Sequence, residues 1–109
     1  MKEIPASAIT DAVARLCVQA CCHLPEDMRT AFEKTLQIEP SAVGRDILRQ
    51  LLENADIAAR ENMPICQDTG LAVIFADVGQ DVHISGGDFS EAVNAGVQKG
   101  YVEGYLRKS

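Results

Sequence analysis

The sequence predicts an α+β fold: a helical amino-terminal half, then a buried apolar strand with a short hairpin, then a glycine-striped helix. In the first half, apolar residues recur at three- and four-residue steps, as they do in amphipathic helices. By contrast, the run from Leu71 to Val78 is nearly all apolar, which is typical of a strand buried on both faces. The spacing of apolar residues therefore changes near residue 64, between a helical first half and a second half that contains both strands and a helix.

Three helices are predicted in the first half. The apolar stripe of the first predicts a helix from about Ser7 to His23. Pro25 suits the first turn of the second helix, which we expect to end near Gln37. Ser41 is a good N-cap for the third helix, which delivers the chain to Pro64.

The second half predicts two strands and one helix. After the apolar run, Gly79-Gln80-Asp81 turns the chain and Val82 to Ile84 makes a short second strand, with His83 on its less buried face. Asp88, with Glu91 three residues later, resembles a capping box that opens the last helix.

The last helix carries small residues at four-residue spacing. Glycine costs about 1 kcal/mol relative to alanine in a helix interior, so a glycine stripe is hard to explain on an open surface. We expect this face to pack closely against another backbone, with ligand contact as the alternative. Its members are Ala92, Gly96, Gly100 and Gly104.

Composition excludes some partners. The chain has 109 residues, 10 basic and 16 acidic, with a formal charge of −6. Nucleic acids and anionic membranes bind clustered Lys and Arg, which this sequence lacks, so we expect neither partner. With no secretory segment and no apolar run of about twenty residues, we expect a cytoplasmic protein.

The four cysteines are expected to be reduced, because the disulfide reading lacks a secretory context. Cys17, Cys21 and Cys22, with His23, could suggest a metal site. Their spacing matches no common zinc pattern, and two of them lie on or beside the apolar stripe. We therefore expect small buried apolar residues there.

The chemistry of the chain is expected between the third helix and the apolar run. Pro64 fixes its own φ, and Gly70 permits a sharp turn, so the polar residues between them can project from a defined loop. This loop places a thiol beside an amide, a carboxylate and a hydroxyl, from Cys66, Gln67, Asp68 and Thr69. By themselves these residues also fit an idle thiol and ordinary turn chemistry.

The segment Met63 to Gly70 resembles the cluster-binding segment of the iron-sulfur hydro-lyases, which include class I fumarate hydratase and the tartrate dehydratase α subunit. The resemblance extends to Ile9–Cys17, Leu24–Asp27 and Gly104–Ser109, and thus covers essentially the whole chain. It implies reversible hydration of a small hydroxy dicarboxylate, with fumarate and tartrate both open as substrates.

The resemblance also implies site residues and a cofactor. Family members hold a 4Fe-4S cluster with three cysteines, and only Cys66 matches a ligand here. Gln67 and Arg107 would bind substrate carboxylates, and Asp68 would bind the substrate and assist proton transfer as a catalytic residue. For Arg107, a solvated cation near a helix end is the equal alternative, and Thr69 is expected to serve the turn.

By the same resemblance, residues 1–109 form the amino-terminal fragment of a larger α/β catalytic domain and are inactive alone. The expected partners are the rest of the catalytic subunit and a homo-oligomer or an α/β subunit assembly.

Two other classes of function stay open. One is a stand-alone thiol or metal protein built on the four cysteines, and the other is a non-catalytic module that dimerises through the glycine face.

Overall fold

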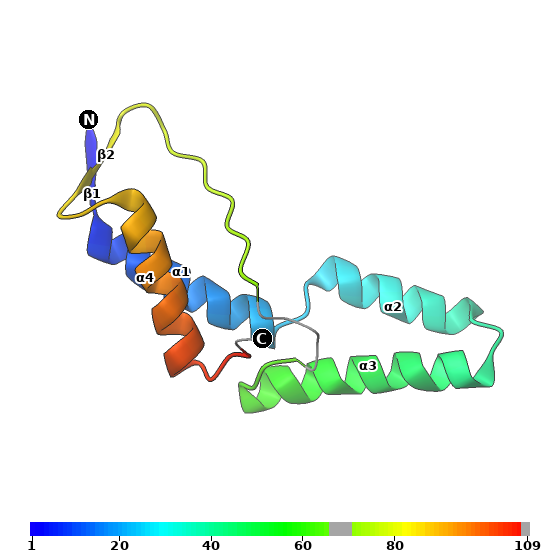
Figure 1. Cartoon of the computed structure of the whole chain (residues 1–109). Coiled ribbons are helices and arrows are strands. Elements are labelled where there is room, and N and C mark those ends of the chain that lie inside the picture. Colours follow the sequence, from blue (N-terminus) through cyan, green and yellow to red (C-terminus); the bar gives the residue numbers. More distant parts are fainter. Residues whose placement is uncertain (66–70, 108–109) are drawn as a thin grey trace. The chain divides into compact units, whose positions relative to one another are not determined.

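The computed structural model describes residues 1–65 and 71–107 (Figure 1). Within them the element order is β1, α1, α2, α3, β2 and α4, which confirms the predicted α+β class. The chain divides into two compact units, the first made of residues 1–19 and 68–109 and the second of residues 20–67.

The first unit contains a two-stranded parallel sheet. β1 (Lys2–Pro5) pairs with β2 (Val82–Ser85), with Lys2 opposite Val82, and Figure 1 shows the two strands together. The predicted strand at 82–84 is confirmed, and His83 is exposed as expected. The predicted hairpin is wrong, because the partner of β2 is the amino-terminal β1. A charged tetrapeptide that ends in proline gives no strand signal, and its pairing with residues so distant in sequence has no local cue.

The predicted buried strand at 71–78 is also wrong. The structure places this segment outside any strand, with Leu71 80%, Val73 64% and Phe75 93% exposed. A strand needs a neighbour for its backbone N–H and C=O groups. Among the described residues, β2 already pairs with β1, and 71–78 has no strand beside it. The apolar composition of 71–78 is therefore compatible with a strand, but composition alone does not supply the neighbouring strand that a sheet requires.

Most of helix α1 (Ala6–Cys22), up to residue 19, and helix α4 (Phe89–Glu103) form the body of the first unit. Asp88 caps α4 as predicted, since its side chain accepts a hydrogen bond from the Glu91 N–H. The glycine face packs against α1: a Cβ on Gly96 would lie 2.7 Å from the Thr10 carbonyl oxygen, and one on Gly100 would lie 2.8 Å from that of Ala14. Close backbone packing is thus the reason for this face.

Two polar contacts join the same pair of helices. The Thr10 hydroxyl donates a hydrogen bond to the Ala92 carbonyl at 2.9 Å, which is possible because the two backbones approach so closely. Lys99 of α4 pairs with Asp11 of α1, with 2.8 Å between Nζ and Oδ1. The glycine face of α4 is therefore covered by α1 of the same chain. It is not exposed for the dimerisation that was the alternative prediction.

The second unit is a helical hairpin of α2 (Glu26–Ile38) and α3 (Ala42–Glu61), drawn side by side in Figure 1. Both predicted helices are confirmed, with Pro25 at the N-cap of α2 and the Ser41 hydroxyl accepting from the Gly44 N–H. Arg29 of α2 forms an ion pair with Asp56 of α3. This pair raises the pKa of Arg29, so the guanidinium stays charged.

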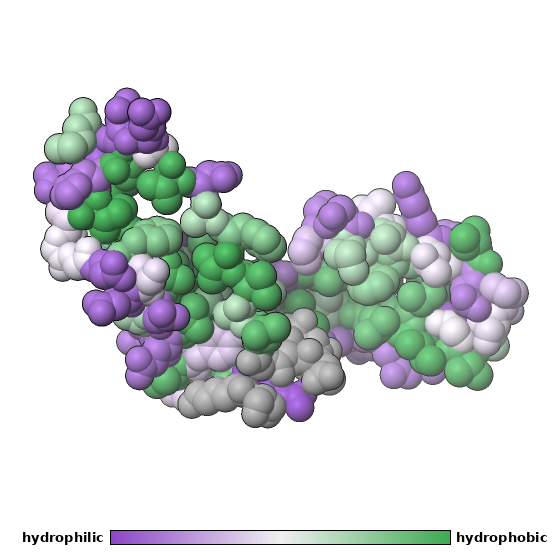
Figure 2. Space-filling model, turned by 45° about the horizontal axis from the view of Figure 1, so that its top comes forward, coloured by the Kyte–Doolittle hydropathy of each residue, from purple (hydrophilic) through white to green (hydrophobic). Residues whose placement is uncertain are grey.

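The core of the described residues is small. Its buried apolar members are mostly alanine, valine and cysteine, and among the described side chains only Cys22 is fully buried. Large apolar side chains remain exposed on both units, and Figure 2 shows broad hydrophobic areas open to solvent on the face it presents. In the described part of the chain, no helix combines the length and apolar character that a membrane crossing requires.

Candidate functional site

Three of the four predicted site residues, Cys66, Gln67 and Asp68, lie outside the described residues, as does Thr69. The structure describes the chain that leads to them. The Met63 N–H donates to the Ala58 carbonyl at 2.9 Å, and the Ile65 N–H donates to the Cys21 carbonyl at 2.7 Å. The backbone is thus held by hydrogen bonds up to the residue before Cys66.

The fourth predicted residue, Arg107, follows the end of α4 and is exposed. The turn before it is anchored by Leu106, which is 4% exposed and whose N–H donates to the Tyr101 carbonyl at 3.0 Å. Gly104 fits closely at the same place, because a Cβ there would lie 2.7 Å from a Val18 methyl of α1. Arg107 is therefore presented from a turn fixed to α1.

Both candidate segments leave the end of a helix through the same kind of turn. In each turn a non-glycine residue adopts a positive φ, 54° at Asn62 and 55° at Tyr105. The next residue then donates its N–H to the carbonyl five residues earlier, as in a Schellman cap. Asparagine tolerates this conformation, whereas a bulky tyrosine there is a genuine outlier. Sequence reasoning missed both turns, although an asparagine at a helix end was a usable signal.

The amino-terminal cysteines have the environment of structural thiols. Cys17 and Cys22 are buried, and Cys21 is partly buried. Burial raises the pKa of the Cys21 and Cys22 thiols, and their proximity adds to this effect at Cys22. A raised pKa disfavours the thiolate that binds metal. Throughout the described ranges, 1–65 and 71–107, no group of three or more His, Cys, Asp or Glu side chains is arranged to hold a metal.

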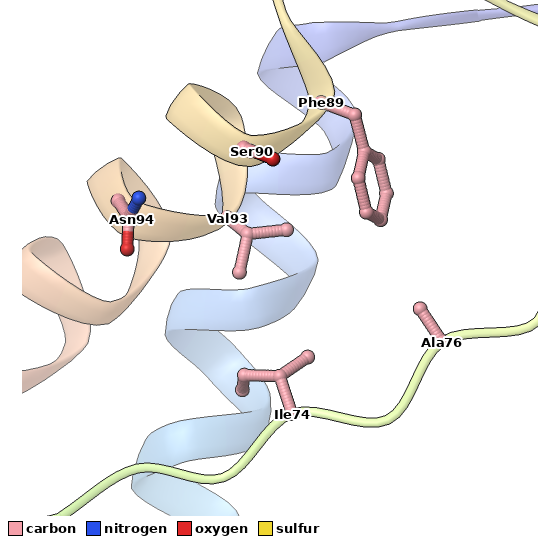
Figure 3. Close-up of a pocket in the computed structure, with 6 residues that line it drawn as sticks. All are labelled: Ile74, Ala76, Phe89, Ser90, Val93 and Asn94. Carbon is pink, nitrogen blue, oxygen red and sulfur yellow. The ribbon is translucent and has the colours of Figure 1, made fainter.

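A pocket of about 230 Å³ in the first unit lies between α4 and the 71–78 segment. Figure 3 shows Phe89 and Val93 of α4 turned toward the segment that carries Ile74 and Ala76. The polar residues that line the pocket are Ser90 and Asn94. The full lining is Ile74, Ala76, Phe89, Ser90, Val93 and Asn94. A dicarboxylate needs cationic donors, so this pocket does not fit the substrate that the sequence suggested.

Comparison with known proteins gives a consistent set of relatives. A family profile described as "Fumarate hydratase (Fumerase)" matches residues 10–109. The putative L(+)-tartrate dehydratase subunit alpha of Methanocaldococcus jannaschii is 34% identical over 100 residues, which cover 91% of this chain and 35% of that protein.

Two relatives from Escherichia coli K12 carry fumarate hydratase names. The anaerobic class I fumarate hydratase is 36% identical over 104 residues, covering 91% of this chain and 19% of the enzyme. The aerobic class I enzyme is 44% identical over 73 residues, covering 65% of this chain and 13% of the enzyme. The chain thus spans about a third or less of the length of the relatives it matches.

Proposed function

Because this chain belongs to the fumarate hydratase family, we propose that it is the amino-terminal part of a hydro-lyase acting on a small hydroxy dicarboxylate. The observation that carries the proposal is the family match over residues 10–109, which includes both the Pro64–Gly70 segment and Arg107. The reaction would be reversible addition of water, between fumarate and malate or between tartrate and its dehydrated product.

The residues of this chain would bind and orient the substrate. Arg107 is exposed on a turn fixed to α1, and its planar guanidinium can hold a carboxylate through two parallel hydrogen bonds. Gln67 can donate two N–H bonds to a carboxylate. Asp68 can accept a hydrogen bond from the substrate hydroxyl, or assist the proton transfer that lets this group leave as water. The base that removes the carbon-bound proton would lie outside this chain.

A 4Fe-4S cluster is the proposed cofactor, with Cys66 as one thiolate ligand. The other cysteines do not fit as its partners, because two of them are buried and burial raises the pKa of Cys21 and Cys22. Two further ligands would thus come from outside this chain. A bound cluster would supply an open iron that acts as a Lewis acid.

The exposed apolar surface supports a larger catalytic assembly. Side chains such as Phe75, 93% exposed, and Leu71, 80% exposed, favour burial against further protein. We propose the rest of the catalytic subunit as the partner, within a homo-oligomer or an α/β subunit assembly, and the cytoplasm as the compartment. We propose neither nucleic acid nor membrane as a partner, and the isolated chain should have no activity.

Fumarate and L(+)-tartrate are both candidate substrates, and each has a specific observation in its favour. The M. jannaschii relative named for tartrate covers 91% of this chain at 34% identity. The aerobic E. coli relative named for fumarate reaches 44% identity over a shorter stretch.

The test is anaerobic turnover by the complete enzyme, meaning the polypeptide and any partner subunit in which this segment works. Fumarate, malate and L(+)-tartrate would be assayed with wild type, Arg107→Lys and the control Arg49→Lys, which changes an exposed arginine on α3. Arg107→Lys keeps the charge but loses the forked donors, so KM should rise about tenfold or more. The control should leave KM unchanged.

Two results would contradict the proposal. Absence of turnover of all three dicarboxylates by the complete enzyme would remove the assigned reaction. An unchanged KM in Arg107→Lys would instead remove this arginine from the substrate site.

A further inference from the structure

The turn at the end of α4 contains a residue that the turn itself does not explain. Among the described residues, Asn62 and Tyr105 are the non-glycine residues with positive φ, and they occupy equivalent positions in matching turns. The end of α3 uses asparagine, which adopts this conformation readily. The end of α4 uses tyrosine, which adopts it with strain.

Packing against the residues that the structure describes does not compensate for this strain. The Tyr105 side chain is 88% exposed, whereas the neighbouring Leu106 is 4% exposed and anchors the turn. The Tyr105 hydroxyl forms no hydrogen bond with any other residue that the structure describes. A glycine or asparagine would make the same turn at lower cost, so neither the turn nor the core of the described residues accounts for a tyrosine here.

The Tyr105 ring lies close in sequence to the arginine that is proposed to bind substrate. Tyr105 and Arg107 flank the buried Leu106, and both are exposed to solvent. A phenol hydroxyl two residues from a guanidinium offers a second, uncharged donor to a ligand that the arginine binds. Backbone strain held at a binding site is a known arrangement, in which the observed outlier points to function.

We propose that Tyr105 is a substrate-contacting residue of the dicarboxylate site, whose hydroxyl donates a hydrogen bond to the substrate bound by Arg107. The inference rests on the proposed function and deepens it. In this account the strained backbone presents the Tyr105 side chain to the substrate. The tyrosine makes the turn less stable than asparagine or glycine would, and it increases the affinity for substrate.

The experiment separates the strain from the contact. Tyr105→Asn installs the residue that the chain uses at position 62, Tyr105→Phe removes only the hydroxyl, and Asn62→Tyr is the matched reverse change. Thermal unfolding of the complete enzyme measures the strain. Calorimetric binding of succinate, a dicarboxylate that cannot be hydrated, and KM for the turned-over substrate measure the contact in the complete enzyme.

The expected results differ between the variants. Tyr105→Asn should raise the Tm by several degrees, Asn62→Tyr should lower it, and Tyr105→Phe should leave it unchanged. Both Tyr105 variants should weaken succinate binding and raise KM by about 10- to 100-fold, as expected for loss of a hydrogen bond to a charged group. Binding should not change in parallel with Tm.

Unchanged succinate affinity and KM in Tyr105→Phe, with wild-type turnover intact, would overturn the inference and leave the proposed function standing. A Tm that does not rise in Tyr105→Asn would overturn the argument from strain. Absence of wild-type turnover of any dicarboxylate would contradict the proposed function, and the inference with it.

Discussion

The two helix pairs of this chain are held together in different ways. In the first unit, α1 and α4 approach until glycine is required, with the Gly96 and Gly100 positions facing backbone oxygens of α1. In the second unit, α2 and α3 meet through side chains, including the Arg29–Asp56 ion pair. A contact between backbones tolerates no added atom, whereas a contact between side chains can adjust. The more demanding contact lies next to the turn that presents Arg107.

Gly96→Leu should give the largest effect, because it places atoms where α1 already lies. Its Cβ would fall 2.6 Å from the Val13 Cβ and 2.7 Å from the Thr10 carbonyl oxygen. We expect a loss of about 3 kcal/mol in the free energy of unfolding, measured by urea denaturation with circular dichroism.

The matched control is Gly79→Ala, where the added Cβ would meet a Val82 methyl at an ordinary 3.6 Å. It should change stability little. If Gly96→Leu were tolerated as well as Gly79→Ala, the close contact between α1 and α4 would be wrong.

Loss of the ion pair in the second unit should give a smaller effect. Asp56→Asn removes the charge opposite Arg29, and both side chains are partly open to solvent, at 59% and 26% exposure. Exposed pairs of this kind contribute about 0.5 kcal/mol, and less at high salt. Urea denaturation at low and high salt measures it, and a loss as large as that of Gly96→Leu would contradict the contrast between the two units.

The smallest effect should appear as a pH dependence in the first unit. Hydrogen bonding and attraction from Lys99 lower the pKa of Asp11 below 3.8. A lowered pKa contributes stability above the ordinary value, which is lost as pH falls through the folded-state value. Asp11→Asn should therefore flatten the acid end of the Tm–pH profile below about pH 4.

The same pair acts at alkaline pH with the opposite sign. Asp11 raises the pKa of Lys99 above 10.5, so its contribution is present below 10.5 and is lost as pH rises through the folded-state value. For the prediction at low pH, the contradicting result is a Tm–pH profile whose acid side is identical in wild type and Asp11→Asn. That result would show that the Asp11–Lys99 pair contributes nothing to stability.

Local signals predicted the helices well. Caps at Ser41 and Asp88, and the apolar stripes between them, are properties of neighbouring residues, and the structure confirms them. The glycine face was predicted to pack closely, because three glycines in one helix are hard to explain on an exposed surface. Its partner, α1, could not be read from the sequence.

Signals that depend on distant residues were not readable. β1 pairs with β2 across most of the chain, and the run 71–78 lies outside any strand despite its composition. The positive φ of Tyr105 was missed because tyrosine is an unusual residue for that turn. Of the predicted site, Arg107 lies on the described part of the chain. The roles of Cys66, Gln67, Asp68 and Arg107 all stay predictions.

The central claim is that this chain contributes a cluster ligand and substrate-binding residues to a hydro-lyase. The most direct test is iron and acid-labile sulfide per complete enzyme, with fumarate and tartrate turnover, in Cys66→Ser and the control Cys21→Ser. We predict that Cys66→Ser loses both the cluster and turnover, and that Cys21→Ser retains them because its thiol has a raised pKa and a structural environment. Wild-type iron content and turnover in Cys66→Ser would contradict the claim.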